Sequence, residues 1–275
     1  MDTLPEAHAS PGSEPGHRMT HQTSRARRRG GLEPLVLEYH AVSDAWTSDL
    51  AVTPAQLRRQ LEWLVRRGYV GATFSQAAAS GSPRTVAVTF DDAYLSVYEL
   101  AYPILASLGL PGTVFVVSDF ADDGRPLVWP GGERARRSAA EEELRGMTWA
   151  QLARVADDGW EVGSHTRTHP RLTQLSDAAL DRELRGSREA CERALRRPCR
   201  SLAYPFGDVD GRVMERAAEA GYELAAIEDP APPEPLRWPR VGIYRADGML
   251  RFRAKVSPLV RRLRSTYGST GRSGR

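Results

Sequence analysis

The stretch Thr85-Val86-Ala87-Val88-Thr89-Phe90-Asp91-Asp92 places two adjacent carboxylates directly after an apolar run. A short run of apolar and β-branched residues is typical of a strand buried in a parallel sheet. The carboxyl ends of parallel strands meet on one side of such a sheet, where α/β folds carry their chemistry. We therefore expect Asp91 and Asp92 to lie at a functional site.

A second polar segment, Ser164-His165-Thr166-Arg167-Thr168-His169-Pro170, also follows a strand-like stretch. Its two histidines are four positions apart. On a helical turn this spacing would place both imidazoles on one face, with about 5–6 Å between their β-carbons. A catalytic zinc-like ion takes a few imidazole and carboxylate ligands and keeps one position open for water. His165, His169 and Asp92 could supply those ligands, and Asp91 could then act as a base.

Each segment taken alone has a simpler structural explanation. Adjacent aspartates after a strand are common at turns and helix N-termini, where their carboxylates accept hydrogen bonds from free N–H groups. Two histidines four residues apart are more often part of a solvated helix face than of a metal site. The two segments together, each at the end of a predicted strand, favour a metal-dependent hydrolase.

Apolar periodicity along the chain alternates between strand and helix. The expected strands are Pro34–Tyr39, Thr85–Phe90, Thr113–Val117, Gly159–Gly163, Arg200–Tyr204, Tyr222–Ile227 and Arg240–Ile243. The expected helices are Pro54–Gly68 with Thr53 as N-cap, Leu95–Leu108, Thr148–Asp158, Ser176–Arg197 and Gly211–Gly221, and the charged stretch Ser118–Gly146 is expected to be mostly loop. Such alternation predicts an α/β protein with parallel strands and outer helices, either an open sheet or a barrel.

Three motifs follow one another along the chain: Thr89-Phe90-Asp91-Asp92, the pair His165 and His169 with its intervening residues, and Ala203-Tyr204-Pro205-Phe206-Gly207. In order and spacing they resemble the motifs of the polysaccharide deacetylases, the NodB-homology domain of carbohydrate esterase family four. The resemblance covers roughly residues 32 to 244. It implies an irregular seven-stranded (β/α) barrel of the NodB-homology type, and so decides between the barrel and the open sheet.

The resemblance also implies a role for each matching residue. Asp92, His165 and His169 would bind a divalent metal, Zn²⁺ with Co²⁺ or Ni²⁺ as alternatives. Asp91 would be the general base. The residue after the proline of the third motif, here Phe206, would donate its backbone N–H to the oxyanion.

The sequence departs from the common family pattern at two places. Many members open the third motif with an arginine that holds the base, where this chain has Ala203-Tyr204. The late histidine that usually serves as the general acid is missing, because no histidine follows His169. The poly-N-acetylglucosamine deacetylase branch, which this chain resembles in its early Tyr39-His40, implies that His40 is the acid. Arg240 is the candidate for the displaced arginine, although an arginine beside a strand is usually a surface charge.

These residues predict a hydrolase that removes N-acetyl groups from a glycan, acting on carbon–nitrogen bonds other than peptide bonds. Two alternatives stay open. A related amidohydrolase on a small non-sugar amide or imide would keep the metal site but need a closed pocket. A glycan-binding domain without turnover would keep the aromatic residues, although the intact Asp91 argues against it. The rings near the motifs, most of them expected in the core, are Tyr39, Tyr94, Trp129, Tyr204, Phe206 and Trp238.

Composition and charge narrow the class of protein. With 275 residues and 41% hydrophobic content, the chain can bury one sizeable core. A net charge of +3, with the excess near both ends, argues against nucleic acid as a partner. No stretch approaches the roughly 18 apolar residues that span a bilayer. The beginning of the chain lacks the apolar core of a secretory signal, so the predicted location is cytoplasmic.

The two ends of the chain differ in composition from its middle. Residues 1–31 are rich in Pro, Gly, Ser and basic residues and are expected to form a disordered tail, with a second flexible tail at 267–275. The catalytic domain is predicted over residues 32–266. Cys191 and Cys199 lie close in sequence, and a disulfide between them is a minor alternative to two free thiols.

Overall fold

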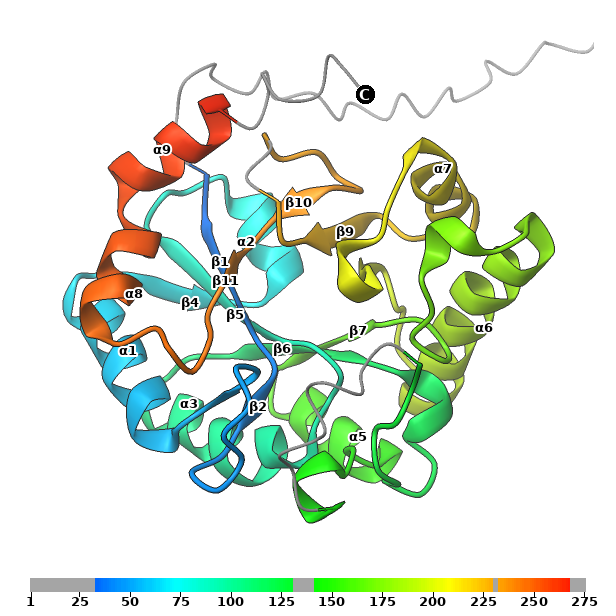
Figure 1. Ribbon diagram of the computed structural model, residues 1–275, viewed down its shortest axis with the longest axis horizontal. Helices are drawn as coiled ribbons and strands as arrows, with labels where there is room; N and C mark the ends of the chain where they lie inside the picture. Colours follow the sequence, from blue (N-terminus) through cyan, green and yellow to red (C-terminus); the bar gives the residue numbers. More distant parts are fainter. Residues whose placement is uncertain (1–32, 131–140, 230–231, 268–275) are drawn as a thin grey trace, which may run out of the picture. The chain divides into compact units, whose positions relative to one another are not determined.

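A computed structural model of the chain shows a parallel sheet that curls into a nearly closed barrel (Figure 1). The structure describes residues 33–130, 141–229 and 232–267. The strands of the main sheet are β1 (Leu35–Tyr39), β4 (Val70–Ala72), β5 (Thr85–Phe90), β6 (Gly112–Val116), β7 (Glu161–Ser164), β8 (Ser201–Ala203), β9 (Leu224–Ile227), β10 (Trp238–Pro239) and β11 (Val241–Gly242). Their order is β10-β9-β8-β7-β6-β5-β1-β11, with β4 beside β5.

One short segment closes the barrel. β10 pairs with β9 and β11 pairs with β1, so the two ends of the sheet are neighbours in the sequence. Arg240 is the single residue between them, and its backbone N–H donates to the carbonyl of Ile227 at 2.8 Å. β4 lies off this path, and if β10 and β11 are counted as one interrupted strand, the described residues provide seven barrel positions. The predicted seven-stranded (β/α) barrel is therefore confirmed.

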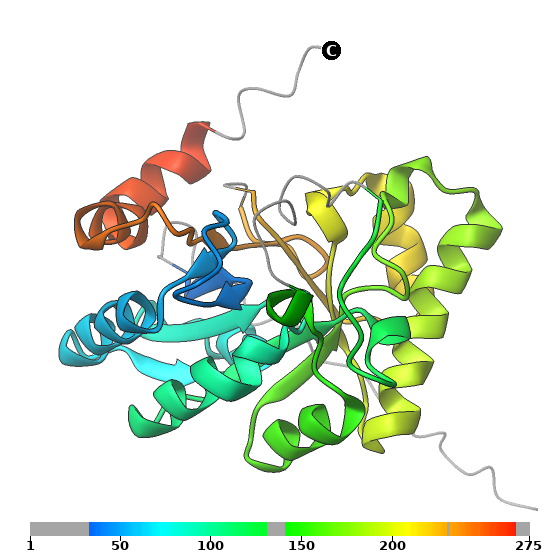
Figure 2. The same cartoon turned by 60° about the horizontal axis from the view of Figure 1, so that its bottom comes forward.

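Helices cover the outside of the barrel (Figures 1 and 2). They are α1 (Pro54–Arg66), α2 (Phe74–Ser80), α3 (Tyr102–Ser107), α5 (Trp149–Asp157), α6 (Asp177–Leu195), α7 (Gly211–Glu219), α8 (Met249–Val256) and α9 (Pro258–Tyr267). As predicted, Thr53 caps α1, because its side chain accepts a hydrogen bond from the N–H of Gln56. A small separate sheet pairs β2 (Ala41–Val42) with β3 (Ala51–Val52).

The predicted helix Leu95–Leu108 differs from the structure. Val97–Ala101 form a π-helical turn before α3, and the N–H of Tyr102 donates to Val97. Pro103 has no N–H to donate, so the regular helical ladder cannot continue through it, and a wider turn accommodates the gap.

The predicted strand Arg240–Ile243 is also wrong in its bounds, because β11 ends at Gly242 and Arg240 interrupts the pairing. The short elements β4, α2, α8 and α9 lie outside the predicted set.

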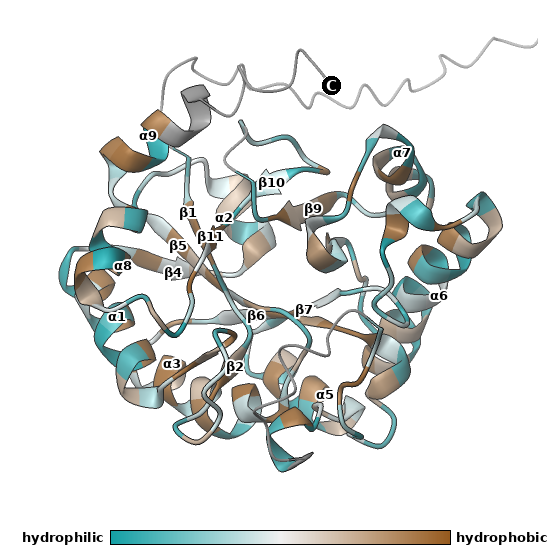
Figure 3. Cartoon of the chain, viewed as in Figure 1, coloured by the Kyte–Doolittle hydropathy of each residue, from teal (hydrophilic) through white to brown (hydrophobic). Residues whose placement is uncertain are grey.

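Two buried clusters follow the two-residue period of the strands. Leu35, Leu37 and Tyr39 of β1 pack in the larger cluster, which includes residues of the outer helices. Val36 belongs to a smaller cluster that is made mostly of strand residues and includes Phe74 and Ala77 of α2. The strands are mostly hydrophobic and the outer helices carry hydrophilic residues, as Figure 3 shows. The same alternation turns Glu38 of β1 to the interior.

The chain ends and the cysteines complete the fold. The predicted tails at 1–31 and 267–275 lie outside the described residues, apart from the backbone of Tyr267 in α9. Cys191 and Cys199 are both buried free thiols. Among the described helices, none combines the length and the apolar character needed to cross a membrane. The cytoplasmic location stays a prediction.

Candidate active site

All seven residues singled out in the sequence line one cavity at the carboxyl ends of the barrel strands. The cavity has a volume of about 870 Å³. These residues come from different strand ends: His40 after β1, Asp91 and Asp92 after β5, His165 and His169 after β7, Phe206 after β8, and Arg240 between β10 and β11. Parallel strands therefore bring together groups that are far apart in the sequence.

Asp92, His165 and His169 form a buried cluster on one side of the cavity. Nε2 of His165 lies 3.3 Å from Oδ1 of Asp92, and Nε2 of His169 lies 3.4 Å from the same oxygen. The two imidazole rings are 4.8 Å apart at 70° to each other. Each of the three residues offers one ligand atom within 4.8 Å of the others, so the cluster could hold a metal ion.

The two histidines lie on a loop, so the expected helical turn is wrong. Thr166 and His169 have left-handed backbone angles, with φ of 67° and 62°. The loop is held by side chains instead of a helical ladder. One carboxylate oxygen of Glu183 accepts the N–H groups of Arg167 and Thr168, each at 2.9 Å. Strained backbone at a side-chain cluster is typical of functional sites.

The hydrogen bonding of this cluster fits a divalent cation. Nδ1 of His165 lies 2.8 Å from the carbonyl oxygen of Ala203 and can only donate to it, which leaves the lone pair of Nε2 facing Asp92. Oδ1 of Asp92 is buried and has no hydrogen-bond donor of suitable geometry among the described residues. A buried carboxylate oxygen without a donor is costly, and a cation between the three ligand atoms would satisfy it.

The charges of this cluster are strongly coupled. Burial alone would raise the pKa of Asp92, but the two imidazoles outweigh it and hold that pKa well below its ordinary value. Burial also lowers the pKa of His165, but the carboxylates of Asp91 and Asp92 outweigh it and raise that pKa. For His169 burial dominates, and its pKa is lowered. The site therefore keeps Asp92 ionised, as a metal ligand must be.

Arg240 holds the carboxylate of Asp91. Nη1 donates to Oδ1 at 2.6 Å and Nη2 donates to Oδ2 at 2.7 Å. The Arg240 side chain is only 2% exposed, so it is not a surface charge. It makes the contact with Asp91 that would orient the base. Burial raises the pKa of Asp91, but the charge of Arg240 outweighs it, with help from His165, and the pKa is lowered.

His40 lies beside this pair, together with a glutamate that the sequence analysis did not select. Ligating atoms of Glu38, His40 and Asp91 all lie within 4.8 Å of one another. Nδ1 of His40 is buried and has no hydrogen-bond partner among the described residues. Glu38 could have been found in the sequence, because it is the one charged residue in the apolar strand Leu35–Tyr39.

Aromatic rings enclose the histidine side of the cavity. Trp129 stacks on His169 with ring centres 4.1 Å apart, and Phe206 meets the same imidazole edge-on at 4.6 Å. Phe206 has a left-handed backbone, with φ of 58°. Of the aromatic residues considered for a sugar groove, Tyr94, Trp129, Tyr204 and Phe206 line the cavity. Tyr39 and Trp238 are buried in the core.

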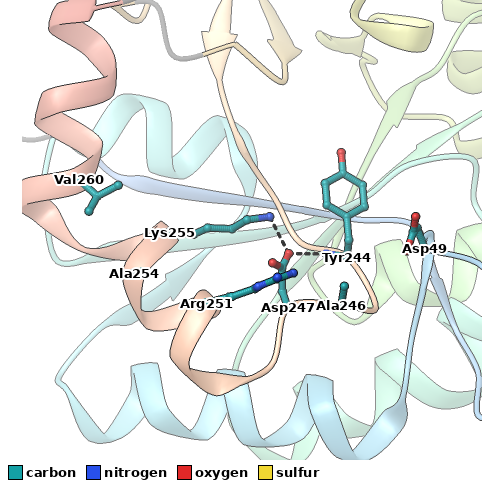
Figure 4. Close-up of a pocket in the computed structure, with 8 residues that line it drawn as sticks. All are labelled: Asp49, Tyr244, Ala246, Asp247, Arg251, Ala254, Lys255 and Val260. Carbon is teal, nitrogen blue, oxygen red and sulfur yellow. Dashed lines mark hydrogen bonds and ion pairs between the residues drawn. The ribbon is translucent and has the colours of Figure 1, made fainter.

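A second cavity of about 600 Å³ adjoins the first and shares Asp49 and Tyr244 with it. Figure 4 shows its wall, where the buried carboxylate of Asp247 accepts hydrogen bonds from Lys255 at 2.6 Å and from the Tyr244 N–H at 2.9 Å. These contacts fix Tyr244 at the boundary between the two cavities.

The sequence model of the polysaccharide deacetylase family matches residues 78–225, which are 148 of the 275 residues. The chain belongs to the polysaccharide deacetylase family. This confirms the predicted family and, with it, the predicted class of hydrolase acting on carbon–nitrogen bonds. The match includes the Asp91-Asp92 and His165–His169 motifs and the Phe206 motif.

Two proteins of similar sequence are also named as deacetylases. YxkH of Bacillus subtilis, named for the same family, is 24% identical over 201 residues, which are 71% of this chain and 64% of YxkH. The chain thus spans less than two thirds of that relative. The poly-β-1,6-N-acetyl-D-glucosamine N-deacetylase of Staphylococcus aureus is 23% identical over 223 residues, 75% of this chain and 71% of that protein.

Solved structures support the fold. A polysaccharide deacetylase from Bacillus cereus superposes with a TM-score of 0.68 and 25% identity, over 82% of this chain and 69% of that one. IcaB from Ammonifex degensii superposes with a TM-score of 0.65 and 23% identity, over 82% of this chain and 97% of that one. At 23% identity, the likeness to IcaB concerns the fold alone.

Proposed function

We propose that this protein is a metal-dependent deacetylase that removes N-acetyl groups from a glycan. One observation carries the proposal: a buried Asp92-His165-His169 cluster lies beside an Asp91 carboxylate held by Arg240, in one cavity. A cation site next to an oriented base is the arrangement that amide hydrolysis by water requires. The names of the relatives favour an N-acetylated polysaccharide, with poly-N-acetylglucosamine as the first candidate.

The metal would be held by Oδ1 of Asp92 and by Nε2 of His165 and of His169. This set of two imidazoles and one carboxylate suits Zn²⁺, with Co²⁺ or Ni²⁺ as alternatives. When bound, the ion would supply Lewis acidity towards the acetyl carbonyl and make water more acidic. The Ala203 carbonyl keeps the His165 ring in the required tautomer, because it accepts the Nδ1 proton.

Asp91 would accept the proton of the attacking water. Its pKa is held low by Arg240, so it is ionised and ready to accept a proton at neutral pH. The two hydrogen bonds to Arg240 fix the plane of the carboxylate before substrate arrives. The backbone N–H of Phe206 would stabilise the oxyanion that forms on the acetyl oxygen.

His40 would donate a proton to the leaving nitrogen. The amine of a sugar leaves poorly as an anion, so a general acid within reach of the leaving nitrogen is required. Among the histidines that line the cavity, His165 and His169 are assigned to the metal, which leaves His40 for this role. One proton then passes to Asp91 and one leaves His40 for each acetyl group removed.

The shape of the site favours an extended substrate over a small amide. The cavity shares Asp49 and Tyr244 with a second one, and Trp129 and Phe206 offer ring faces and edges of the kind that pack against sugar C–H groups. A small amide or imide would instead require a closed pocket.

Acetate release tests the proposal. The full chain is stripped with chelator, reloaded with Zn²⁺, Co²⁺ or Ni²⁺, and incubated with β-1,6- and β-1,4-linked N-acetylglucosamine oligomers and with small amides and imides. We expect metal-dependent release of acetate from at least one oligomer series. Hydrolysis of the small amides alone would assign the site to the amidohydrolase alternative, and glycan binding without acetate release would assign it to a binding domain.

A further inference from the structure

Glu38 is a buried carboxylate that the reaction described above does not use. It is 5% exposed and lines the cavity next to Arg240 and Asp91. Burial raises its pKa to about 7, although the charge of Arg240 opposes the shift. An ionisable group that is this costly to bury is seldom kept for stability, because an apolar residue of similar volume would be at least as stabilising.

Arg240 is shared between two carboxylates from two strands. Nη2 donates to Oδ2 of Asp91 at 2.7 Å and forms an ion pair with Oε2 of Glu38 at 3.0 Å, a contact without hydrogen-bond geometry. Nη1 donates to Oδ1 of Asp91 at 2.6 Å and to Oγ1 of Thr89 at 3.0 Å. Asp91 and Arg240 form a buried pair, with side chains that are 4% and 2% exposed. The contacts with Glu38 and Thr89 tie that pair to β1 and β5.

A second cation at this position is ruled out by charge. The grouping of Glu38, His40 and Asp91 resembles a set of metal ligands by distance alone. The guanidinium of Arg240 already lies between the two carboxylates and makes ion pairs with both. A divalent ion there would be repelled by a fixed positive charge about 3 Å from its ligands.

We infer that Glu38 is a positioning residue, which holds the Arg240 guanidinium and thereby fixes where the Asp91 carboxylate lies relative to His40. The inference rests on the proposed function. β1 carries both Glu38 and, two positions later, His40. One strand would thus place the acid directly and the base through Glu38 and Arg240. Misplacement of a reacting group by about 1 Å can cost roughly 10²-fold in rate, so the tether affects turnover more than substrate binding.

The test is a double-mutant cycle between Glu38 and Arg240. Glu38→Met preserves length and volume but removes the carboxylate, and Glu38→Gln retains a polar oxygen at the same place without the charge. For Glu38→Met we expect kcat to fall about 10- to 100-fold with KM within about twofold, equally on an acetamido sugar and on an aryl acetate. Glu38→Gln should recover most of that loss. In an Arg240→Met background, Glu38→Met should cost less than about twofold more, because the group it positions is gone.

Glu161→Met is the matched control. Glu161 is a half-buried carboxylate at the start of β7, outside the cavity, where it accepts hydrogen bonds from the N–H and hydroxyl of Ser75. Its loss should lower the melting temperature and leave kcat unchanged. Melting temperature and bound metal are measured for every variant. If Glu38→Met does not fold, Glu38→Ala replaces it in the same cycle, because Glu38→Gln is expected to keep most of the wild-type rate.

Two results would overturn the inference. The first is that Glu38→Met lowers kcat as much in the Arg240→Met background as in the wild type. The second is that Glu38→Met lowers kcat on the acetamido sugar and not on the aryl acetate. Either would mean that Glu38 acts on something other than Arg240. A wild-type protein that hydrolyses no acetamido substrate would instead defeat the proposed function, so the two failures are distinguishable.

Discussion

The side chains of Arg240 and Asp91, which are 149 positions apart in the sequence, share two hydrogen bonds of 2.6 and 2.7 Å inside the barrel. Arg240 occupies the break between β10 and β11, at the point where the sheet closes on itself. The segment that closes the barrel thus also carries the partner of the candidate base. Closure of the fold and orientation of Asp91 depend on the same residue.

Arg240→Met should lower turnover by about 10²-fold or more, because the Asp91 carboxylate loses its charged partner and its alignment. Bound metal, measured by elemental analysis, should stay close to the wild-type content. Arg240→Lys is the matched control for charge. A lysine cannot form the bidentate contact, so we expect only partial recovery of the rate. A wild-type rate in the methionine variant would contradict the orienting role.

Asp91→Asn should abolish acetate release while the protein still binds metal, because the base is lost and all three proposed ligands remain. Acetate release and metal content are measured on the same sample. Loss of metal together with activity would make Asp91 a ligand instead of a base.

His165→Ala and His169→Ala should each remove both metal and activity, because two remaining ligands bind a divalent ion much more weakly than three. The measurement is metal content after dialysis against a weak chelator. His40→Ala is the control, since His40 lies in the same cavity outside the proposed ligand set and should retain metal. Stoichiometric metal in either of the first two variants would refute the ligand assignment.

His40→Ala should reduce turnover of an acetamido sugar by roughly 10²–10⁴-fold, which is the usual contribution of a general acid. An acetate ester with a phenol leaving group needs little protonation, so its hydrolysis should fall far less. The ratio of the two rates, measured at one pH and metal loading, separates acid catalysis from a general defect. Equal losses on the two substrates would point to a structural role for His40.

Glu38 should make the stability of the protein depend on pH in a defined direction. Burial raises its pKa from 4.5 to about 7, with Arg240 opposing this shift and Asp91, His40 and Glu228 acting on it more weakly. The folded protein therefore holds the Glu38 proton more tightly than the unfolded chain does. The stability that this proton contributes is complete below pH 4.5 and is lost as the pH rises to about 7.

The measurement is urea unfolding of the wild type and of Glu38→Gln between pH 4.5 and 8. Relative to the variant, the wild type should lose on the order of 2–3 kcal/mol of unfolding free energy over this range. Comparison with the variant cancels the titration of groups common to both proteins. Parallel stability curves would show that Glu38 titrates as it does in the unfolded chain.

Most of the barrel could be predicted because its signals are local. The apolar runs of β1 and β5 and the Thr53 cap of α1 lie within a few residues of the structure they determine. The π-helical turn before α3 was missed, although Pro103 indicates a break, because the sequence does not say how the helix will absorb a missing donor. The loop of the two histidines was missed because its backbone is held by Glu183, from a helix further along the chain.

The amino-acid sequence by itself determined the family, the alternation of strands and helices, and the chemical groups that reach the carboxyl ends of the strands, because motif order and two-residue alternation are properties of the chain alone. Only the tertiary structure decided which of those groups meet. Arg240 contacts Asp91 and Glu38 because the barrel closes at that residue, and no local pattern specifies where a sheet will close. Glu38 became recognisable as part of the site for the same reason. Its burial and its neighbours arise from strands that pair across long sequence separations.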